Sequence, residues 1–283
     1  MTELPPQLVY DADEVAEARR LVICAPGALT RVEIFDPLRA WRDGGWAPVF
    51  YPFPGLDGRP LAPPLDIQAA AEEIAAFARA QAGKQVCLLG FSTGGAIVIE
   101  AATRLGPKVR TVAIAPGLPR AGGWRTMLAA TRDVLGAALR VRSVGVRRVW
   151  LEYYRVLLFG RRVLAHSDTR ETSRTLTAAR AARMVYPEGG LLRAHATGLK
   201  RWAGPRRRLP VPGHVTLLVG DADPVFSTAQ TRRFAEAQGG LDVRVFPGHG
   251  HMLFLTEPSV FDIAREIFEG DPPAPAGASG VSD

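Results

Sequence analysis

The segment "LLGFSTGGAIV" (88–98) places one serine among glycines, between two apolar runs. The run before the glycines is typical of a strand buried on both faces. The run after them, continued as "AIVIEAATRLG", is typical of a helix that ends near Gly106. Residues 90–94 fit the pattern G-x-S-x-G. In a strand–turn–helix, this spacing holds the hydroxyl of Ser92 at the carboxyl end of the strand, beside a helix N-terminus.

The sequence on either side of this segment alternates between strand and helix patterns. Such alternation predicts a parallel sheet covered by helices on both faces. A helix over 30–45 is expected to open with a capping box from Thr30 to Glu33 and to kink at Pro37. The expected strands lie within 20–26, 46–55, 84–91, 108–117, 214–224 and 241–248, and the other expected helices are 66–83, 227–238 and 258–270.

The alternation stops between Leu118 and about Pro212, where no strand pattern is found. Three helices are expected there, over 124–141, 168–186 and 190–204, the second opening with a capping box from Asp168 to Glu171. The first is expected to carry one apolar stripe, made of Trp124, Met127, Leu128, Leu135, Ala138 and Leu139. We therefore predict a core of 1–117 and 213–270, a helical insertion of 118–212, and a disordered tail of 271–283.

The charge of the chain is unevenly distributed. The formal net charge is +7, but residues 120–208 contain 20 Lys and Arg against five Asp and Glu, whereas the remainder contains 15 against 23. A difference of this size indicates that the insertion is a distinct, Arg-rich module.

A serine hydroxyl is a poor nucleophile until a base takes its proton, and that base needs an orienting acid. His251 and His249 follow an expected strand and so lie at the same sheet edge as Ser92. His251, after Gly250, is the expected base, and His249 is the weaker candidate. The other histidines, His166, His195 and His214, are expected in surface or packing roles.

The acid is expected after the strand that ends in "LLVGDADPV". Asp223, which Pro224 holds in the turn, is the preferred residue, and Asp221 could instead cap that turn.

With these residues identified, the chain resembles the α/β-hydrolase-fold serine hydrolases. The order Ser92, Asp223, His251 is the nucleophile–acid–histidine order of that fold. The phrases "GFSTGG", "VGDADPV" and "GHGHMLFLTEP" resemble its nucleophile elbow, acid loop and histidine loop. The resemblance covers about residues 18–117 and 212–269, and the segment between resembles the helical cap of the fold. It implies an α/β class, with a mostly parallel central sheet, helices on both faces and an inserted cap.

The resemblance also implies an oxyanion hole formed by the backbone N–H groups of Thr93 and Ala28, with Leu29 as the alternative to Ala28. Pro26 stands where many relatives have a histidine. Only "QLVY" precedes the strand "LVICAP", so the usual opening hairpin is expected to be reduced to one edge strand or lost. The residues expected to contact the acyl group of a substrate are Leu29, Phe91, Tyr153, Tyr154 and Leu157.

The reaction that this resemblance implies is the cleavage of carboxylic esters through an acyl-enzyme on Ser92, with no cofactor and no metal. A thioesterase or acyltransferase with the same triad remains an alternative, as does a non-catalytic binding protein on this fold, because one fold hosts many functions.

The arginines of the insertion allow three interpretations. They could be the hydrated faces of ordinary helices, or draw an anionic or amphiphilic acyl substrate towards Ser92. They could also dock on an anionic membrane, with apolar contacts from Trp124, Trp150, Tyr153, Tyr154 and Leu157. Nucleic-acid binding is not expected, because no recognised motif accompanies the charge.

Several classes are disfavoured by composition. Cys24 and Cys87 lie in expected buried strands and are interpreted as reduced core thiols. No Cys/His cluster has zinc spacing, and no apolar run approaches the roughly 20 residues of a membrane span. The N-terminal sequence lacks the basic and apolar regions of a signal peptide. We therefore expect a cytoplasmic protein.

Overall fold

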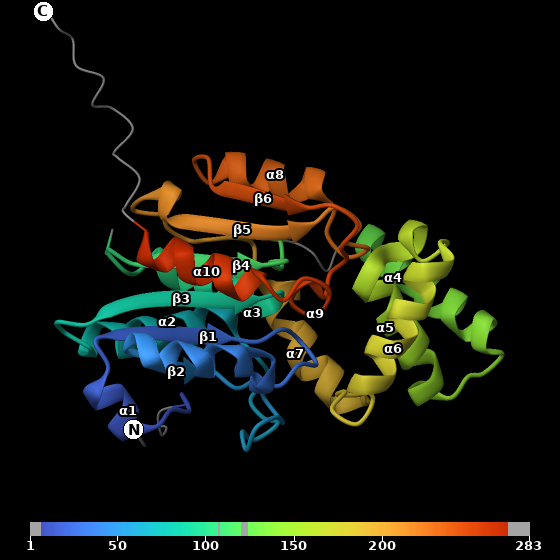
Figure 1. Cartoon of the computed structure of the whole chain (residues 1–283), viewed down its shortest axis with the longest axis horizontal. Helices are drawn as coiled ribbons and strands as arrows, with labels where there is room; N and C mark the ends of the chain where they lie inside the picture. The colour runs from blue at the N-terminus through green and yellow to red at the C-terminus, as the bar shows by residue number, and fades with distance from the viewer. Residues whose placement is uncertain (1–6, 107, 120–123, 271–283) are drawn as a thin grey trace, which may run out of the picture.

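The computed structural model describes residues 7–106, 108–119 and 124–270. Its six strands form one sheet in the order β2-β1-β3-β4-β5-β6, and every neighbouring pair is parallel (Figure 1). This confirms the predicted parallel sheet. The strands are β1 (Arg20–Ala25), β2 (Trp46–Phe50), β3 (Gln85–Phe91), β4 (Arg110–Ile114), β5 (Val215–Gly220) and β6 (Asp242–Phe246).

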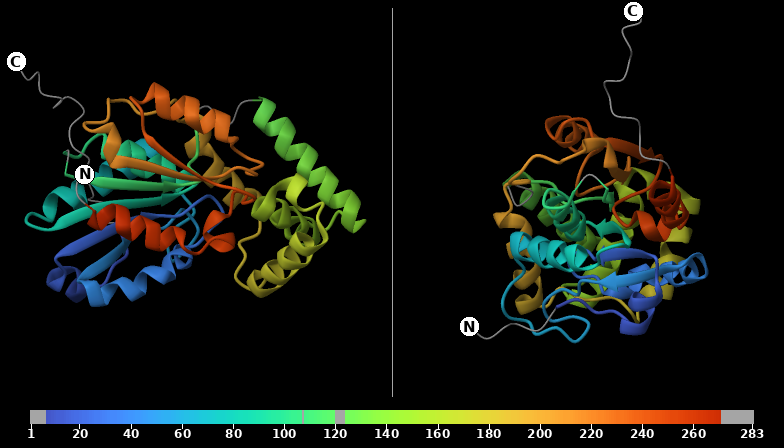
Figure 2. Two further views of the ribbon diagram at one scale, coloured as in Figure 1. Left: turned by 45° about the horizontal axis from the view of Figure 1, so that its top comes forward. Right: turned by 90° about the vertical axis from the view of Figure 1, so that its left-hand side faces the viewer.

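Helices cover both faces of this sheet, as its strand sequences require. In β1 the side chains of Leu21 and Ile23 join one apolar core and those of Val22 and Cys24 join the other, because successive strand residues point to opposite faces. One face packs against α2 (Ile67–Ala80), α3 (Thr93–Ala102) and α8 (Thr228–Ala237). The other packs against η1 (Val32–Gly44), α9 (Leu253–Thr256) and α10 (Val260–Glu269) (Figure 2).

The segment before β1 contributes little to the sheet. Val9 makes a single antiparallel bridge to Phe50 at the β2 edge, and a short helix, α1 (Ala12–Glu17), follows. The expected loss of the opening hairpin therefore holds for the described residues, whereas α1 was not predicted.

The segment after β1 differs from the prediction. Residues Val32–Gly44 form a 3₁₀ helix, not a kinked α-helix. Its buried side chains Phe35, Leu38 and Trp41 recur every third residue, which is the repeat of a 3₁₀ helix. The predicted capping box is also wrong, because the Thr30 hydroxyl donates to the carbonyl of Gly27 at 2.7 Å instead of capping this helix.

Among the described residues, four α-helices lie between β4 and β5: α4 (Trp124–Val141), α5 (Val146–Val163), α6 (Ser167–Arg180) and α7 (Gly189–Arg201). The first three lie beyond the carboxyl ends of the strands (Figure 1). The short 3₁₀ helix η2 (Pro212–His214) follows α7. No strand occurs among the described residues of 118–212, as predicted, but α5 was missed. The helix predicted from Asp168 begins at Ser167, with His166 as its N-cap and no side-chain cap. The predicted disorder of 271–283 concerns residues outside the described ones.

Helix α4 does not bury the apolar stripe that the sequence predicts. Leu128, Leu135 and Leu139 are exposed, while Asp133 and Ala137 on the opposite side are buried. Burial of Asp133 is stabilised by Arg161 of α5, whose Nη2 donates to Oδ2 at 3.0 Å. The side chains of Trp124 and Met127 lie outside the described residues.

Helix α7 attaches the inserted helices to the core through buried polar contacts. The imidazole of His195 is fully buried; its Nδ1 accepts from the Leu29 N–H at 3.0 Å, and its Nε2 lies 2.8 Å from the Pro54 carbonyl. The Nε2–H tautomer satisfies both contacts. Just beyond α7, the indole of Trp202 donates to the buried carboxylate of Glu100 on α3 at 2.9 Å.

We predict that His195 makes the stability of the fold pH-dependent. Burial lowers the pKa of this imidazole below its usual 6.5, against the opposing effect of the Pro54 hydrogen bond. The unfolded chain then binds the proton more readily than the folded one, so the stabilisation is complete above pH 6.5 and is lost as the pH falls below it. Urea unfolding at a series of pH values measures this loss.

The variant His195→Gln should be less stable above neutral pH by about 1–3 kcal/mol, since a buried N–H loses its acceptor. Its deficit against the wild type should shrink in acid. The control is His166→Gln, at an exposed position, which should change neither the stability above neutral pH nor its dependence on pH. An equal deficit at all pH values would contradict a neutral, buried His195.

Candidate functional site

Ser92 lies in the tight turn between β3 and α3. Its backbone adopts φ 50° and ψ −117°, a region that residues other than glycine rarely occupy. The turn is held by hydrogen bonds: the Ser92 N–H donates to the Ile114 carbonyl at 2.9 Å, and the Ser92 carbonyl accepts from the Gly117 N–H at 2.7 Å. The strained turn is thus fixed to the neighbouring strand and the loop that follows it.

The turn requires glycine at position 94, two residues after the serine, because a side chain there would have no room. A Cβ atom at position 94 would lie 2.0 Å from the carbonyl oxygen of Ala25 and 2.4 Å from that of Pro26. Gly27 also lies close to the serine, since a Cβ there would lie 3.0 Å from the Cβ of Ser92. The start of α3 and the loop after β1 therefore touch, backbone to backbone, beside the serine hydroxyl.

The structure brings Ser92, His251 and Asp223 together in one hydrogen-bonded chain. The Nε2 atom of His251 lies 3.0 Å from Oγ of Ser92, and its Nδ1 lies 2.8 Å from Oδ2 of Asp223. Ser92 and His251 are buried, and the Asp223 side chain is only 1% exposed. In the sequence His251 is 28 positions from Asp223 and 159 from Ser92, so only the fold brings the three residues together.

The second oxygen of Asp223 fixes the orientation of the carboxylate. Oδ1 accepts from the N–H groups of Val225 at 2.6 Å and Phe226 at 3.0 Å, which leaves Oδ2 directed at the imidazole. Charge-assisted bonds of this kind hold a side chain in one rotamer.

The two alternative residues are placed elsewhere. Oδ1 of Asp221 accepts from the Gly248 N–H at 2.7 Å, which ties the acid loop to the histidine loop. The imidazole of His249 meets the Thr256 hydroxyl at 2.8 Å. Neither has a contact with Ser92 among the described residues.

Helix α5 supports the acid loop and the histidine loop, which no sequence pattern predicted. The N–H groups of Gly250 and Met252, on either side of His251, donate to the carbonyls of Leu158 and Leu157 at 2.8 and 3.0 Å. These carbonyls are available because α5 is interrupted at Gly160, where φ is 70°. A Cβ at Gly160 would lie 2.2 Å from the carbonyl of Ala222, next to Asp223.

The loop after β1 and the start of α3 hold the backbone N–H groups that are expected to form the oxyanion hole. The strand order reverses between β1 and β3, the place where ligands bind in such sheets. In the described residues the N–H groups of Ala28 and Thr93 have no acceptor, whereas the Leu29 N–H is engaged by His195. Leu29 is therefore a poorer candidate than Ala28 for an oxyanion donor. His195 belongs to the support of this site, and no local sequence pattern indicates a contact across 166 residues.

The five residues expected to contact an acyl group do not line one cavity. Leu29 and Tyr154 share a small cleft with Arg180 and Arg183, and Tyr153 lines a separate groove. Phe91 and Leu157 are packed in the core, where the Phe91 ring lies 5.4 Å from that of His251. Phe91 thus packs against the imidazole of His251 instead of lining a substrate pocket.

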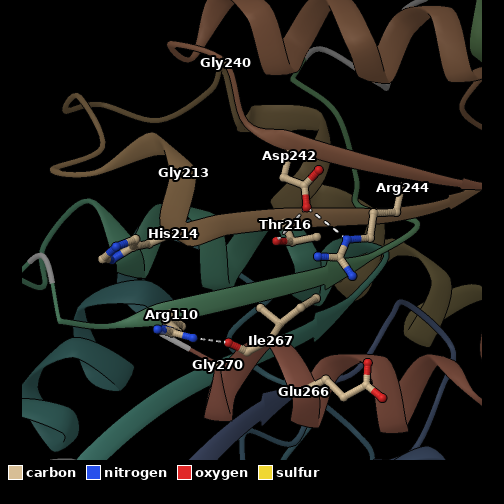
Figure 3. Close-up of a pocket in the computed structure, with 10 residues that line it drawn as sticks. All are labelled: Arg110, Gly213, His214, Thr216, Gly240, Asp242, Arg244, Glu266, Ile267 and Gly270. Atoms are coloured by element: carbon tan, nitrogen blue, oxygen red, sulfur yellow. Dashed lines mark hydrogen bonds and ion pairs between the residues drawn. The ribbon is translucent and has the colours of Figure 1, made fainter. Parts of the chain in front are cut away.

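A further cavity, of about 520 Å³, lies at the amino ends of β4, β5 and β6, the edge opposite Ser92 (Figure 3). Its polar groups bind one another: Asp242 accepts from Arg244 at 3.0 Å, and Arg110 donates to the Ile267 carbonyl. No group of three or more His, Cys, Asp or Glu in the described part of the chain is arranged to hold a metal ion.

The two cysteines are free and buried, as expected. Burial raises the pKa of both thiols, that of Cys87 to about 12, so neither forms a reactive thiolate near neutral pH.

Comparison with solved structures identifies the architecture. The crystal structure of BpoC from Mycobacterium tuberculosis, described as a "putative non-heme bromoperoxidase", superimposes with a TM-score of 0.70 over 95% of this chain and 97% of its own, at 15% identity. A thermophilic esterase from Thermogutta terrifontis has a TM-score of 0.63 (92% and 94% covered, 15% identity). An enol-lactonase from Burkholderia xenovorans has a TM-score of 0.65, with 92% of this chain and 94% of its own covered, at 14% identity. At such identities the likeness establishes the fold alone.

No curated protein sequence matches the chain. Residues 22–262, however, match the sequence model of the "Alpha/beta hydrolase family". That span contains all six strands except the first two residues of β1, as well as the Ser92 turn, the inserted helices and the histidine loop. The fold expected from the resemblance is confirmed, and the chain belongs to the alpha/beta hydrolase family.

Proposed function

We propose that the protein is a serine hydrolase that cleaves carboxylic esters through an acyl-enzyme on Ser92. The observation that carries this proposal is the chain of hydrogen bonds from Ser92 Oγ through His251 to Asp223, at 3.0 and 2.8 Å. Such a chain provides a nucleophile, its general base and the group that orients the base.

In the proposed reaction, Ser92 Oγ attacks the ester carbonyl carbon while His251 Nε2 takes the hydroxyl proton. The N–H groups of Ala28 and Thr93 stabilise the negative oxygen of the tetrahedral intermediate. The intermediate collapses, the C–O bond of the ester breaks, and the leaving alkoxide takes the proton from His251. Water then attacks the acyl-enzyme, giving its proton to His251, and the carboxylic acid leaves as Ser92 regains a proton. Asp223 stays ionised and fixes the imidazole tautomer.

The inserted helices of 118–212 serve in this proposal as a cap over the site. Helix α5 contributes to the support of Asp223 and His251, so the cap would act on the reacting groups as well as on substrate access.

We predict that Ser92→Ala abolishes labelling by a fluorophosphonate probe and lowers kcat for p-nitrophenyl esters by about 10⁶-fold, because the covalent step is lost. Asp223→Asn should lower kcat by about 10⁴-fold. An amide at 223 still accepts from Val225 and Phe226 but no longer stabilises the imidazolium.

The matched control is Asp221→Asn, two residues away in the same loop. Its amide oxygen can still accept from Gly248, so kcat should stay close to that of the wild type. Esterase activity that survives in Ser92→Ala, or equal losses at 221 and 223, would refute the assignment. Wild-type protein that neither labels nor turns over any ester would favour a binding protein on this fold.

We predict that Gly160→Ala lowers kcat by about 10- to 100-fold while KM changes little, because the new Cβ pushes against the Ala222 carbonyl and displaces Asp223. Steady-state kinetics on p-nitrophenyl esters, together with thermal unfolding, measures both effects.

Gly136→Ala in α4 is the control, since a Cβ there meets only the end of the Arg140 side chain, at 3.4 Å. This change should leave kcat unaltered and favour the helix. A Gly160→Ala enzyme with wild-type kcat would show that α5 does not position the acid.

The leaving group that the site prefers is tested by comparing an oxygen ester with the thioester of the same acyl group. The proposal expects the oxygen ester to be the better substrate by kcat/KM. A preference for the thioester would replace the esterase assignment with that of a thioesterase on the same triad.

A further inference from the structure

Exposed apolar side chains are concentrated on the inserted helices. Of ten large apolar side chains that are exposed in the described part of the chain, seven belong to this segment and six lie between residues 128 and 146. An ordinary hydrated surface scatters such residues singly, and a contiguous group marks an interaction site.

Helix α4 carries the central part of this group. It packs on α5 and forms the outer edge of the molecule (Figure 2). Leu128, Leu135 and Leu139 recur at spacings that place them on one side of the helix, and they are 58%, 58% and 78% exposed. The turn that follows adds Val144, which is 95% exposed, and Val146.

A groove of about 590 Å³ between α4, α5 and the start of α7 adjoins these residues. Val144 and Val146 contribute to both the exposed group and the groove, so the two form one apolar surface. The groove is otherwise lined by Val134, Ala138, Val149, Trp150, Tyr153, Pro187 and Leu192.

Arginines surround this apolar surface. Arg132 and Arg142 flank the leucines on α4, and Arg147 and Arg148 follow Val146; all four are exposed. Within the described residues none of them has an ion pair with a carboxylate, in contrast to Arg140 and Arg161. The face therefore combines exposed apolar side chains with uncompensated positive charge.

We infer that this face, made of Leu128, Leu135, Leu139, Val144, Val146 and the four arginines, docks the protein on an anionic lipid surface. Apolar side chains enter the boundary of the acyl region while arginines bind the negative headgroups, which is how amphipathic helices bind membranes. A second copy of the chain fits less well, because a twofold contact would bring the same arginines together. Every helix of the described residues is too short or too polar to be a membrane span.

This assignment replaces the apolar contacts expected from the sequence. Tyr153, Tyr154 and Leu157 are buried and cannot enter a lipid layer, whereas Trp150 lines the groove of this surface. The side chain of Trp124 lies outside the described residues. The inference goes beyond the proposed function. The inserted helices α4 and α5, which carry this face, lie beyond the carboxyl ends of the strands (Figure 1).

The test is sedimentation of the full chain with vesicles of phosphatidylcholine, with and without phosphatidylserine, at low and high salt. We expect binding that requires phosphatidylserine and weakens as salt screens the arginines. Arg147→Gln with Arg148→Gln should weaken it by about fivefold for each charge removed. Leu135→Gln with Leu139→Gln should weaken it by about tenfold or more, with glutamine preserving the helix.

Matched controls lie outside the inserted helices. Leu61→Gln removes an exposed leucine, and Arg232→Gln with Arg233→Gln removes two exposed charges of α8; neither should alter binding. An unchanged thermal midpoint shows that each variant is folded. Equal binding to both vesicle types, equal loss in the controls, or self-association that the leucine variant abolishes without vesicle binding would overturn the inference. Because phosphatidylcholine and phosphatidylserine are themselves carboxylic esters, the sedimentation is done with Ser92→Ala protein, so that these outcomes are independent of Ser92 chemistry.

Discussion

The strained turn at Ser92 is the constraint on which the site depends. A non-glycine residue at φ 50° is held there by two backbone hydrogen bonds and by the contact of Gly94 with the loop after β1. The imidazole of His251 meets the hydroxyl at 3.0 Å. The close approach of Gly94 therefore fixes the serine turn against the loop after β1, and the expected oxyanion donors, Ala28 and Thr93, belong to the two segments that it joins.

The inserted helices are joined to this arrangement at two points. Helix α5 binds the backbone on either side of His251 and touches the acid loop through Gly160. Helix α7 holds the loop after β1 through His195, whose Nδ1 accepts a hydrogen bond from the Leu29 N–H. A segment with a different composition from the core thus shares the support of the proposed catalytic groups, and movements of the insertion would reach them directly.

The sequence allowed prediction of what depends on local pattern. Alternating strands and helices predicted the parallel sheet, and the three loop motifs singled out Ser92, Asp223 and His251, which the structure brings together. Apolar spacing alone did not separate a 3₁₀ helix at Val32–Gly44 from an α-helix, nor the exposed leucines of α4 from a buried stripe. His195 and Gly160 were missed because their roles depend on contacts with residues distant in the chain, which no local pattern records.

The most direct test of the account is to find the covalent intermediate. The protein is mixed with an activated p-nitrophenyl ester, quenched in acid within the first turnovers, digested and mapped by mass spectrometry. The account predicts one added acyl group, on the peptide that contains Ser92, and faster loss of that group at neutral pH in the wild type than in Asp223→Asn. An acyl group found only on another residue, or none on Ser92 in an enzyme that turns over the ester, would contradict it.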